Sequence, residues 1–92
     1  PKGAAERAAA AKALYRTGLQ QLLMGNSRGA LRQFKRALAA RPSYALAYRG
    51  LGLAHQKLGS KALARAAFRR YLVLRPSAAD AASIRARLES LK

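Results

Sequence analysis

The sequence predicts an all-α fold in which antiparallel helix hairpins stack as a short α-solenoid of five helices, and three observations support this. Residues 11–44 align without a gap to residues 45–78 and agree at 12 of 34 positions. Apolar residues recur at helical spacing between glycines and prolines that end each segment. Alanine supplies 23 of the 92 residues, and such small side chains suit helices that pack closely. A fixed period of this length indicates an array of similar small units.

The period divides the chain into four segments. Residues 1–10 are an Ala-rich extension of the first helix, residues 11–44 and 45–78 are two repeat units, and residues 79–92 are a C-terminal capping helix. Residues 1–5 carry few side chains that could pack against another helix, so we expect this end to fray. Because the chain starts with Pro1 rather than Met, we expect it to belong to a longer protein.

The first unit is expected to contain two helices. Helical spacing runs from about Ala4 to Met24, and Gly25 with Asn26 supplies a stop. The second helix begins near Ser27, whose hydroxyl can cap it. It ends before Pro42, because the residue preceding a proline is disfavoured in the helical region. Its apolar stripe comprises Ala30, Leu31, Phe34, Ala37 and Leu38.

Three further helices follow the same logic. Their expected N-caps are Ser43, Ser60 and Ser77, and the expected stops of the first two are Gly59 and Pro76. Asp80, three residues after Ser77, completes a pattern that resembles a capping box. The apolar stripes are Ala47, Tyr48, Leu51, His55 and Leu58; then Leu63, Ala64, Ala67, Phe68, Tyr71, Leu72 and Leu74; then Ala81, Ile84, Leu88 and Leu91.

Two glycines lie inside helices at equivalent positions of the two units, Gly18 and Gly52. Glycine in a helix interior costs about 0.5–1 kcal/mol relative to alanine. That cost is offset only where another helix needs the space, so both glycines predict helix crossings.

These features resemble the tetratricopeptide repeat (TPR) family. The residues that carry the resemblance are Gly18 and Gly52, Ala30 and Ala64, Phe34 and Phe68, Ala37, and the closing Pro42 and Pro76, all within a 34-residue period. Leu14, Thr17 and Tyr71 depart from the family's pattern. The resemblance covers residues 11–92 and implies a right-handed TPR-like solenoid of two full repeats plus a capping helix.

The resemblance also implies a protein-protein interaction module that binds its partner in a concave groove lined by the first helix of each hairpin. The groove residues would be Lys12, Tyr15, Arg16, Leu19, Leu22, Leu23, Leu46, Arg49, Leu53, Gln56 and Lys57, with Asp80, Ser83 and Arg87 from the cap. Such a surface combines aliphatic side chains with cations. It therefore suits a protein or peptide segment with apolar anchors and acidic flanks.

Specificity is expected where the two units differ, at Tyr15 against Arg49, Lys12 against Leu46 and Leu23 against Lys57. Reversing the charges of Arg49 and Lys57 should weaken binding of the partner and leave folding intact. The family's carboxylate clamp uses Lys, Asn, Asn, Lys and Arg where this chain has Tyr15, Leu19, Gly50, Asp80 and Ile84. None matches, which disfavours a clamp for acidic C-terminal tails.

The net charge of +16 suggests a second kind of partner. The second helices carry basic rows on the expected convex side: Arg28, Arg32, Lys35, Arg36, Lys61, Arg65, Arg69 and Arg70. Nucleic acid or another anionic surface is the functional alternative. Only Tyr15 and Tyr44 would then be free to stack on bases. A solvated face in an Arg-rich and Ala-rich composition explains the same rows, and self-association to a homo-oligomer through the end of the array is a third alternative.

Catalysis is not expected. The three carboxylates, Glu6, Asp80 and Glu89, are spread along the chain, and the one histidine, His55, fits a packed or groove-edge position. Without cysteine, with a single histidine and without a glycine-rich phosphate loop, the sequence predicts no metal site and no cofactor. The longest uncharged stretch has 11 residues, so no membrane span is expected. No signal peptide is visible, and we expect a cytoplasmic location.

Replacing Phe68 with alanine tests the predicted core. We expect a loss of about 3–5 kcal/mol in the free energy of unfolding, because a packed ring leaves a cavity when it is removed. A melting curve that does not change would contradict the assignment of Phe68 to the core.

Overall fold

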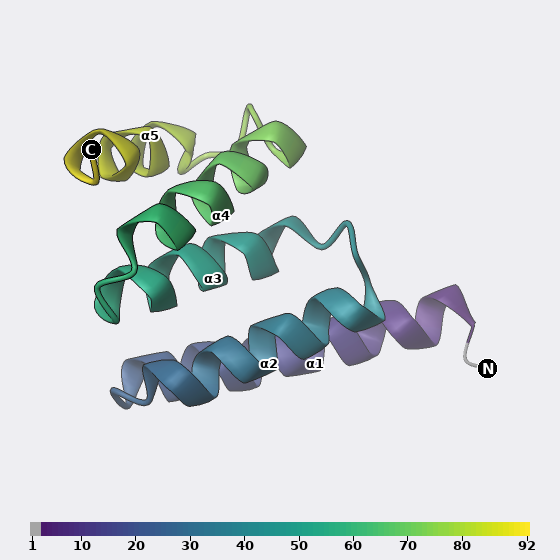
Figure 1. The fold of residues 1–92 in the computed structure, drawn as a ribbon. Coiled ribbons are helices and arrows are strands. Elements are labelled where there is room, and N and C mark those ends of the chain that lie inside the picture. The colour runs from purple at the N-terminus through teal and green to yellow at the C-terminus, as the bar shows by residue number, and fades with distance from the viewer. Residues whose placement is uncertain (1–2) are drawn as a thin grey trace.

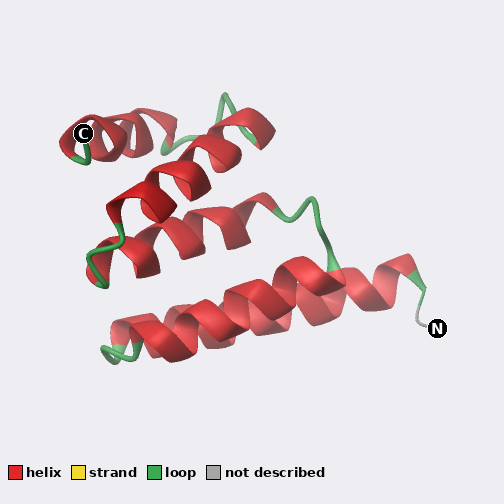
Figure 2. Cartoon of the chain, viewed as in Figure 1, coloured by secondary structure: helices red, strands yellow, loops and turns green. Residues whose placement is uncertain are grey.

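The computed structural model describes residues 3–92, which form five α-helices joined by short turns (Figures 1 and 2). The helices are α1 (Ala4–Leu23), α2 (Ser27–Ala40), α3 (Ala45–Lys57), α4 (Lys61–Leu74) and α5 (Ala81–Ser90). In Figure 1, α1 and α2 form one antiparallel layer, α3 and α4 form the next, and α5 lies beyond α4. The molecule measures 41 × 29 × 19 Å. The predicted all-α array of five helices is confirmed.

The N-terminal boundary differs in part from the expectation. Ala4 and Ala5 are already helical, so the fraying expected over residues 1–5 does not occur at these two positions. Pro1 and Lys2 lie outside the described residues.

Each hairpin turns at the glycine that the sequence predicts as a helix stop, and both glycines have positive φ. Gly25 has φ 85° and Gly59 has φ 79°, a backbone conformation that side-chain-bearing residues rarely adopt. Around Gly25 the Gly25 amide donates to the Leu22 carbonyl (3.1 Å) and the Asn26 amide to the Gln21 carbonyl (2.8 Å). Both bonds satisfy carbonyls that the helix end leaves without a partner.

The helix starts differ from three of the expected serine caps. The N-cap of α2 is Asn26, whose Oδ1 accepts from the Gly29 amide (3.0 Å), and Ser27 is the first helical residue. Helix α3 begins after Tyr44 rather than Ser43, because the Tyr44 amide first closes a turn onto the Arg41 carbonyl (3.0 Å).

The start of α5 also differs. Two successive turns, from the Ala78 amide to the Arg75 carbonyl and from the Ala81 amide to the Ala78 carbonyl, delay the helix until Ala81. The expected capping box of Ser77 and Asp80 therefore does not form. Ser60 is the N-cap of α4 as expected, although its side chain makes no capping hydrogen bond.

The core is built around two phenylalanine rings, Phe34 and Phe68, which are fully buried. Phe34 lies against two glycines, one in its own repeat and one in the next. A Cβ on Gly18 would stand 2.6 Å from the ring, and a Cβ on Gly50 would stand 2.7 Å from it. Gly52 lies against Phe68 in the same way. The predicted helix crossings at Gly18 and Gly52 are confirmed, and the contact at Gly50 adds a crossing between repeats.

The prediction is wrong for one member of the apolar stripes. Leu63 was expected to face the core but is 56% exposed, whereas Ala64 and Ala67 of the same helix are buried. Consecutive residues of a helix point about 100° apart, so burial of position 64 turns position 63 toward solvent.

The helix contacts give the array its curvature. Close contacts join α1 to α3 but do not join α2 to α4. The first helices of the two hairpins, α1 and α3, are therefore closer together than the second helices, α2 and α4. The array of hairpins curves toward the side of α1 and α3. The surface of α1, α3 and α5 is the concave side, and that of α2 and α4 is the convex side.

Gly50→Ala tests the contact between repeats. We expect it to lower the free energy of unfolding by about 1–2 kcal/mol, because crowding of a close-packed site outweighs the gain in helix propensity. The measurement is urea unfolding followed by circular dichroism.

Arg16→Ala is the matched control, because Arg16 occupies the same position of the first repeat and is exposed. It should change the free energy of unfolding by less than about 0.5 kcal/mol. A Gly50→Ala protein as stable as the unaltered chain would contradict the ring-on-glycine contact.

Candidate functional site

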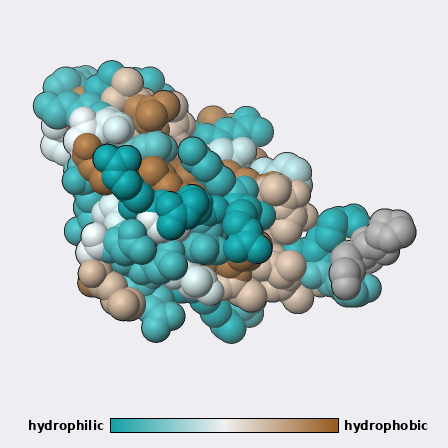
Figure 3. Space-filling model, turned by 60° about the horizontal axis from the view of Figure 1, so that its bottom comes forward, coloured by the Kyte–Doolittle hydropathy of each residue, from teal (hydrophilic) through white to brown (hydrophobic). Residues whose placement is uncertain are grey.

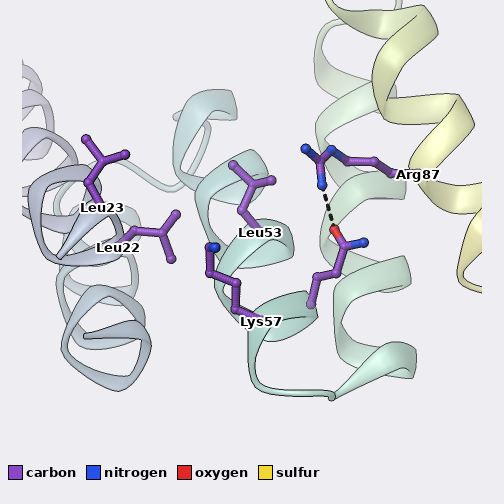
Figure 4. A pocket seen from close by; sticks show the side chains of 6 residues that line it. Leu22, Leu23, Leu53, Lys57 and Arg87 are labelled. Atoms are coloured by element: carbon purple, nitrogen blue, oxygen red, sulfur yellow. Dashed lines mark hydrogen bonds between the residues drawn. The ribbon is translucent and has the colours of Figure 1, made fainter. Parts of the chain in front are cut away.

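An open pocket of about 540 Å³ lies on the concave side between α1, α3 and α5. Its lining residues are Leu22, Leu23, Leu53, Gln56, Lys57 and Arg87. Figure 4 shows Leu22 extending from α1 toward α3, with Leu53 and the side chain of Lys57 on the facing side of α3. On the opposite edge Arg87 donates a hydrogen bond to Gln56 (2.9 Å).

The lining combines apolar surface with positive charge. Leu22 is buried and Leu53 half-buried, whereas Leu23 is 89% exposed. Lys57 has no hydrogen-bond or ion-pair partner within residues 3–92, and no carboxylate lines the pocket. The pocket can therefore accept an apolar side chain beside a negative charge.

A polar network lies further along the same side and holds the helices together. Arg49 of α3 donates to Asp80 Oδ2 (2.8 Å) and to Tyr15 Oη on α1 (2.6 Å). Tyr71 of α4 donates its hydroxyl proton to Asp80 Oδ1 (2.5 Å). Four side chains thus connect α1, α3, α4 and the residue before α5.

The network also determines which groups are charged. Burial alone would lower the pKa of Arg49, but its hydrogen bonds to Asp80 and Tyr15 reverse this and raise the pKa. The hydrogen bond from Tyr71, and after it the one from Arg49, lowers the pKa of Asp80 against the opposing effect of burial. Burial and the bond to Asp80 raise the pKa of Tyr71. At neutral pH the site therefore contains a guanidinium, a carboxylate and a neutral phenol.

The structure divides the fourteen groove residues predicted from the sequence into separate groups. Six line the pocket: Leu22, Leu23, Leu53, Gln56, Lys57 and Arg87. The other eight comprise Tyr15, Arg49 and Asp80 in the network, Lys12 and Arg16 exposed on α1, Ser83 exposed on α5, and Leu19 and Leu46 half-buried against the core. Of the three differing pairs, only Leu23 and Lys57 meet at the pocket.

Two expectations about this surface change. Tyr15 is only 6% exposed and already bonded, so it is not available to stack on bases. Arg49 is committed to Asp80, so Arg49→Glu would place two carboxylates together. The expectation that this reversal leaves folding intact no longer holds.

The sequence reasoning missed the partnership of Tyr71 with Asp80. Two signals were present. Tyr71 stands where the repeat family favours a small residue, and Asp80 is one of three carboxylates among 19 cations. A bulky phenol and a rare carboxylate near the same repeat boundary are candidates for a contact.

Two further groups have shifted pKa values. Burial, and after it the neighbouring Tyr15, raises the pKa of Tyr44. The other group is His55, which is half-buried on α3. Burial lowers its pKa, and the nearby charge of Lys35 lowers it further, so the imidazole is neutral at pH 7. Within residues 3–92, no group of three or more His, Asp or Glu side chains is placed to hold a metal ion. No helix in this part of the chain is long and apolar enough to cross a bilayer.

Stacked helix hairpins, repeated ring-on-glycine contacts and an open concave pocket define a helical repeat scaffold. The chain belongs to the tetratricopeptide repeat family, since the family model with that description matches residues 15–81. No curated protein and no solved structure matches it significantly. Proteins of this family use a non-catalytic scaffold fold that generally mediates protein-protein interaction.

The lowered pKa of Asp80 predicts a pH dependence of stability. A carboxyl whose pKa is lower in the folded than in the unfolded chain stabilises the fold. For Asp80 this stabilisation is complete at pH values above the ordinary pKa of 3.8. That contribution disappears as the pH falls through the folded-state pKa. Free energies of unfolding, measured by urea titration from neutral to acidic pH, should therefore decrease in acid.

Two variants isolate the contribution of Asp80. Asp80→Asn should be less stable at neutral pH and lose less stability on acidification than the unaltered chain. Glu89→Gln is the control, because Glu89 pairs with Lys92 on the surface (3.0 Å) and such exposed pairs contribute little. An acid profile of Asp80→Asn that matches the unaltered chain would show that Asp80 does not cause the decrease.

Proposed function

We propose that the concave surface binds a protein segment in which an apolar side chain lies beside acidic residues. The observation that carries this proposal is the pocket, where Leu22 and Leu53 lie next to Lys57 and Arg87. The family's general role in protein-protein interaction supports a protein partner.

The apolar part of the pocket supplies affinity. Burial of apolar surface contributes about 25 cal/mol per Å², and an aliphatic or aromatic anchor would cover Leu23 as well as the half-buried Leu53. The pocket is large enough for one such side chain with adjacent backbone.

The cations supply orientation and a fast encounter. Lys57 is exposed and unpaired in the described structure, and the Arg87 guanidinium there bonds only to the uncharged amide of Gln56. With a net charge of +16 on the chain, an acidic partner is attracted from a distance and an acidic residue beside its anchor meets these two cations.

One face of α1 extends the site away from the pocket. Lys12, Arg16, Leu19 and Leu23 follow one another at helical spacing, so they share one face. The ten residue-to-residue steps from Lys12 to Leu22 span about 15 Å of helix, which an extended peptide covers with about five residues. The proposed ligand therefore has a second acidic group about five residues from its apolar anchor.

Nuclear magnetic resonance titration tests the proposal. The probe is a synthetic peptide with one leucine and glutamates on both sides of it, and its controls replace the leucine by serine or the glutamates by lysines. Amide shifts of the isotope-labelled chain should change first at Leu53 and Lys57 and along α1. Both control peptides should bind more weakly.

Charge reversal gives the matched comparison. The double variant Lys57→Glu, Arg87→Glu should bind the acidic peptide about tenfold more weakly at low salt, because rim charges steer encounter. Arg28→Glu, Arg32→Glu changes the same net charge on the convex side and should change affinity by less than about threefold. Equal losses in the two variants would contradict binding in the pocket.

A further inference from the structure

The convex side carries a concentration of positive charge that the concave site does not use. Its members are Arg28, Arg32, Lys35 and Arg36 of α2 with Lys61, Arg65, Arg69 and Arg70 of α4. All of these except the half-buried Arg65 are exposed. Figure 3 brings the α1 and α2 side forward and shows strongly hydrophilic side chains gathered over the middle of that surface.

Within residues 3–92, neither Asp80 nor Glu89 neutralises this convex set. Asp80 is committed to Arg49 and Tyr71, and Glu89 pairs with Lys92. Glu6 lies in the first turn of α1. The side chains of five members of the set make no hydrogen bond, ion pair or ring contact in the part of the chain that the structure describes: Arg28, Arg32, Lys35, Lys61 and Arg69. An anionic ligand would relieve the repulsion among them.

The two basic rows lie on either side of α3, which contacts both α2 and α4. Lys35 of α2 lies close enough to His55 for its charge to act on the imidazole, and the Arg70 guanidinium of α4 lies 5.9 Å above the centroid of Tyr48. Tyr48 and His55 are seven residues apart and therefore share a face of α3. Cations of α2 and α4 therefore lie toward this face of α3 from both sides.

We propose that this convex surface binds the phosphate backbone of nucleic acid without reading its sequence. Arginine matches phosphate geometry with two parallel donors, and arginine supplies six of the eight side chains. Base readout would need exposed aromatic or other groups that reach the bases. Here Phe34, Phe68, Tyr71 and Tyr15 are buried, and Tyr48 lies beneath Arg70. The half-buried Tyr44 packs edge-on against Tyr15 and lies beneath Arg41.

A membrane surface fits the same face less well. Segments that lie on anionic bilayers insert large apolar side chains among their cations. The exposed positions of α2 carry no such side chain, and the two on α4, Leu63 and Val73, stand at opposite ends of that helix. Because the convex and concave surfaces are separate, nucleic acid and a protein segment can bind at the same time.

Fluorescence polarisation with a labelled DNA duplex of random sequence and about 20 base pairs tests the proposal, from about 50 to about 200 mM salt. The test variant is Arg28→Gln, Arg32→Gln, Arg69→Gln, which removes three unpaired charges. The matched control is Lys12→Gln, Arg16→Gln, Lys57→Gln, which removes three exposed charges from the concave side.

The unaltered chain should lose affinity steeply with salt. The convex variant should reduce the slope of log affinity against log salt by up to about 2.7, since each phosphate contact contributes about 0.9, and the control should keep the slope. Equal slopes for both variants, or affinity independent of salt, would overturn the proposal. The proposal would also be overturned if the unaltered chain bound phosphatidylserine vesicles but not the duplex, and the convex variant lost this vesicle binding. Circular dichroism of each variant confirms that it is folded.

Discussion

The contact of Phe34 with Gly18 and Gly50 is the constraint on which the rest of the structure depends. The ring lies where a Cβ on either glycine would collide with it, so α1 and α3 can both approach α2 only because these two positions have no side chain. This approach brings α1 nearer to α3 than α2 is to α4. The resulting curvature places the pocket on one side of the molecule and the two arginine-rich helices on the other.

The polar network decides which cations of the inner surface remain for a partner. Arg49 and Asp80 have side chains only 27% and 32% exposed, and charges at this depth require partners. Arg49 and Asp80 are partners of each other. Arg49 also donates a hydrogen bond to Tyr15, and Asp80 also accepts one from Tyr71. Arg49 is therefore occupied within the fold. Lys57 and Arg87, at the other end of the surface, stay accessible beside the exposed apolar side chain of Leu23.

Features that depend on one residue type in one local conformation could be predicted from the sequence. A turn with positive φ requires glycine, and a ring against a helix backbone requires glycine beneath it, so the hairpins and the crossings at Gly18 and Gly52 were predictable. The starts of α3 and α5 were not, because turn hydrogen bonds compete with the expected serine caps. The bond of Arg49 to Tyr15 was not predictable either. It joins side chains 34 residues apart, so it depends on how one repeat is placed against the next. Nothing in the sequence distinguishes Arg49 from Lys57 or another groove cation.

The bond between Tyr15 and Arg49 also gives the two repeats a fixed order. Because these residues occupy the same position of successive units, the hydrogen bond joins unlike side chains from one unit to the next. A tandem duplication of residues 45–78 would set a second arginine against Arg49, and two guanidiniums repel each other. A tandem duplication of residues 11–44 would set two tyrosines together, which can share a hydrogen bond. Gene duplication can therefore lengthen this array by copying its first unit, while a copy of its second unit needs a compensating substitution.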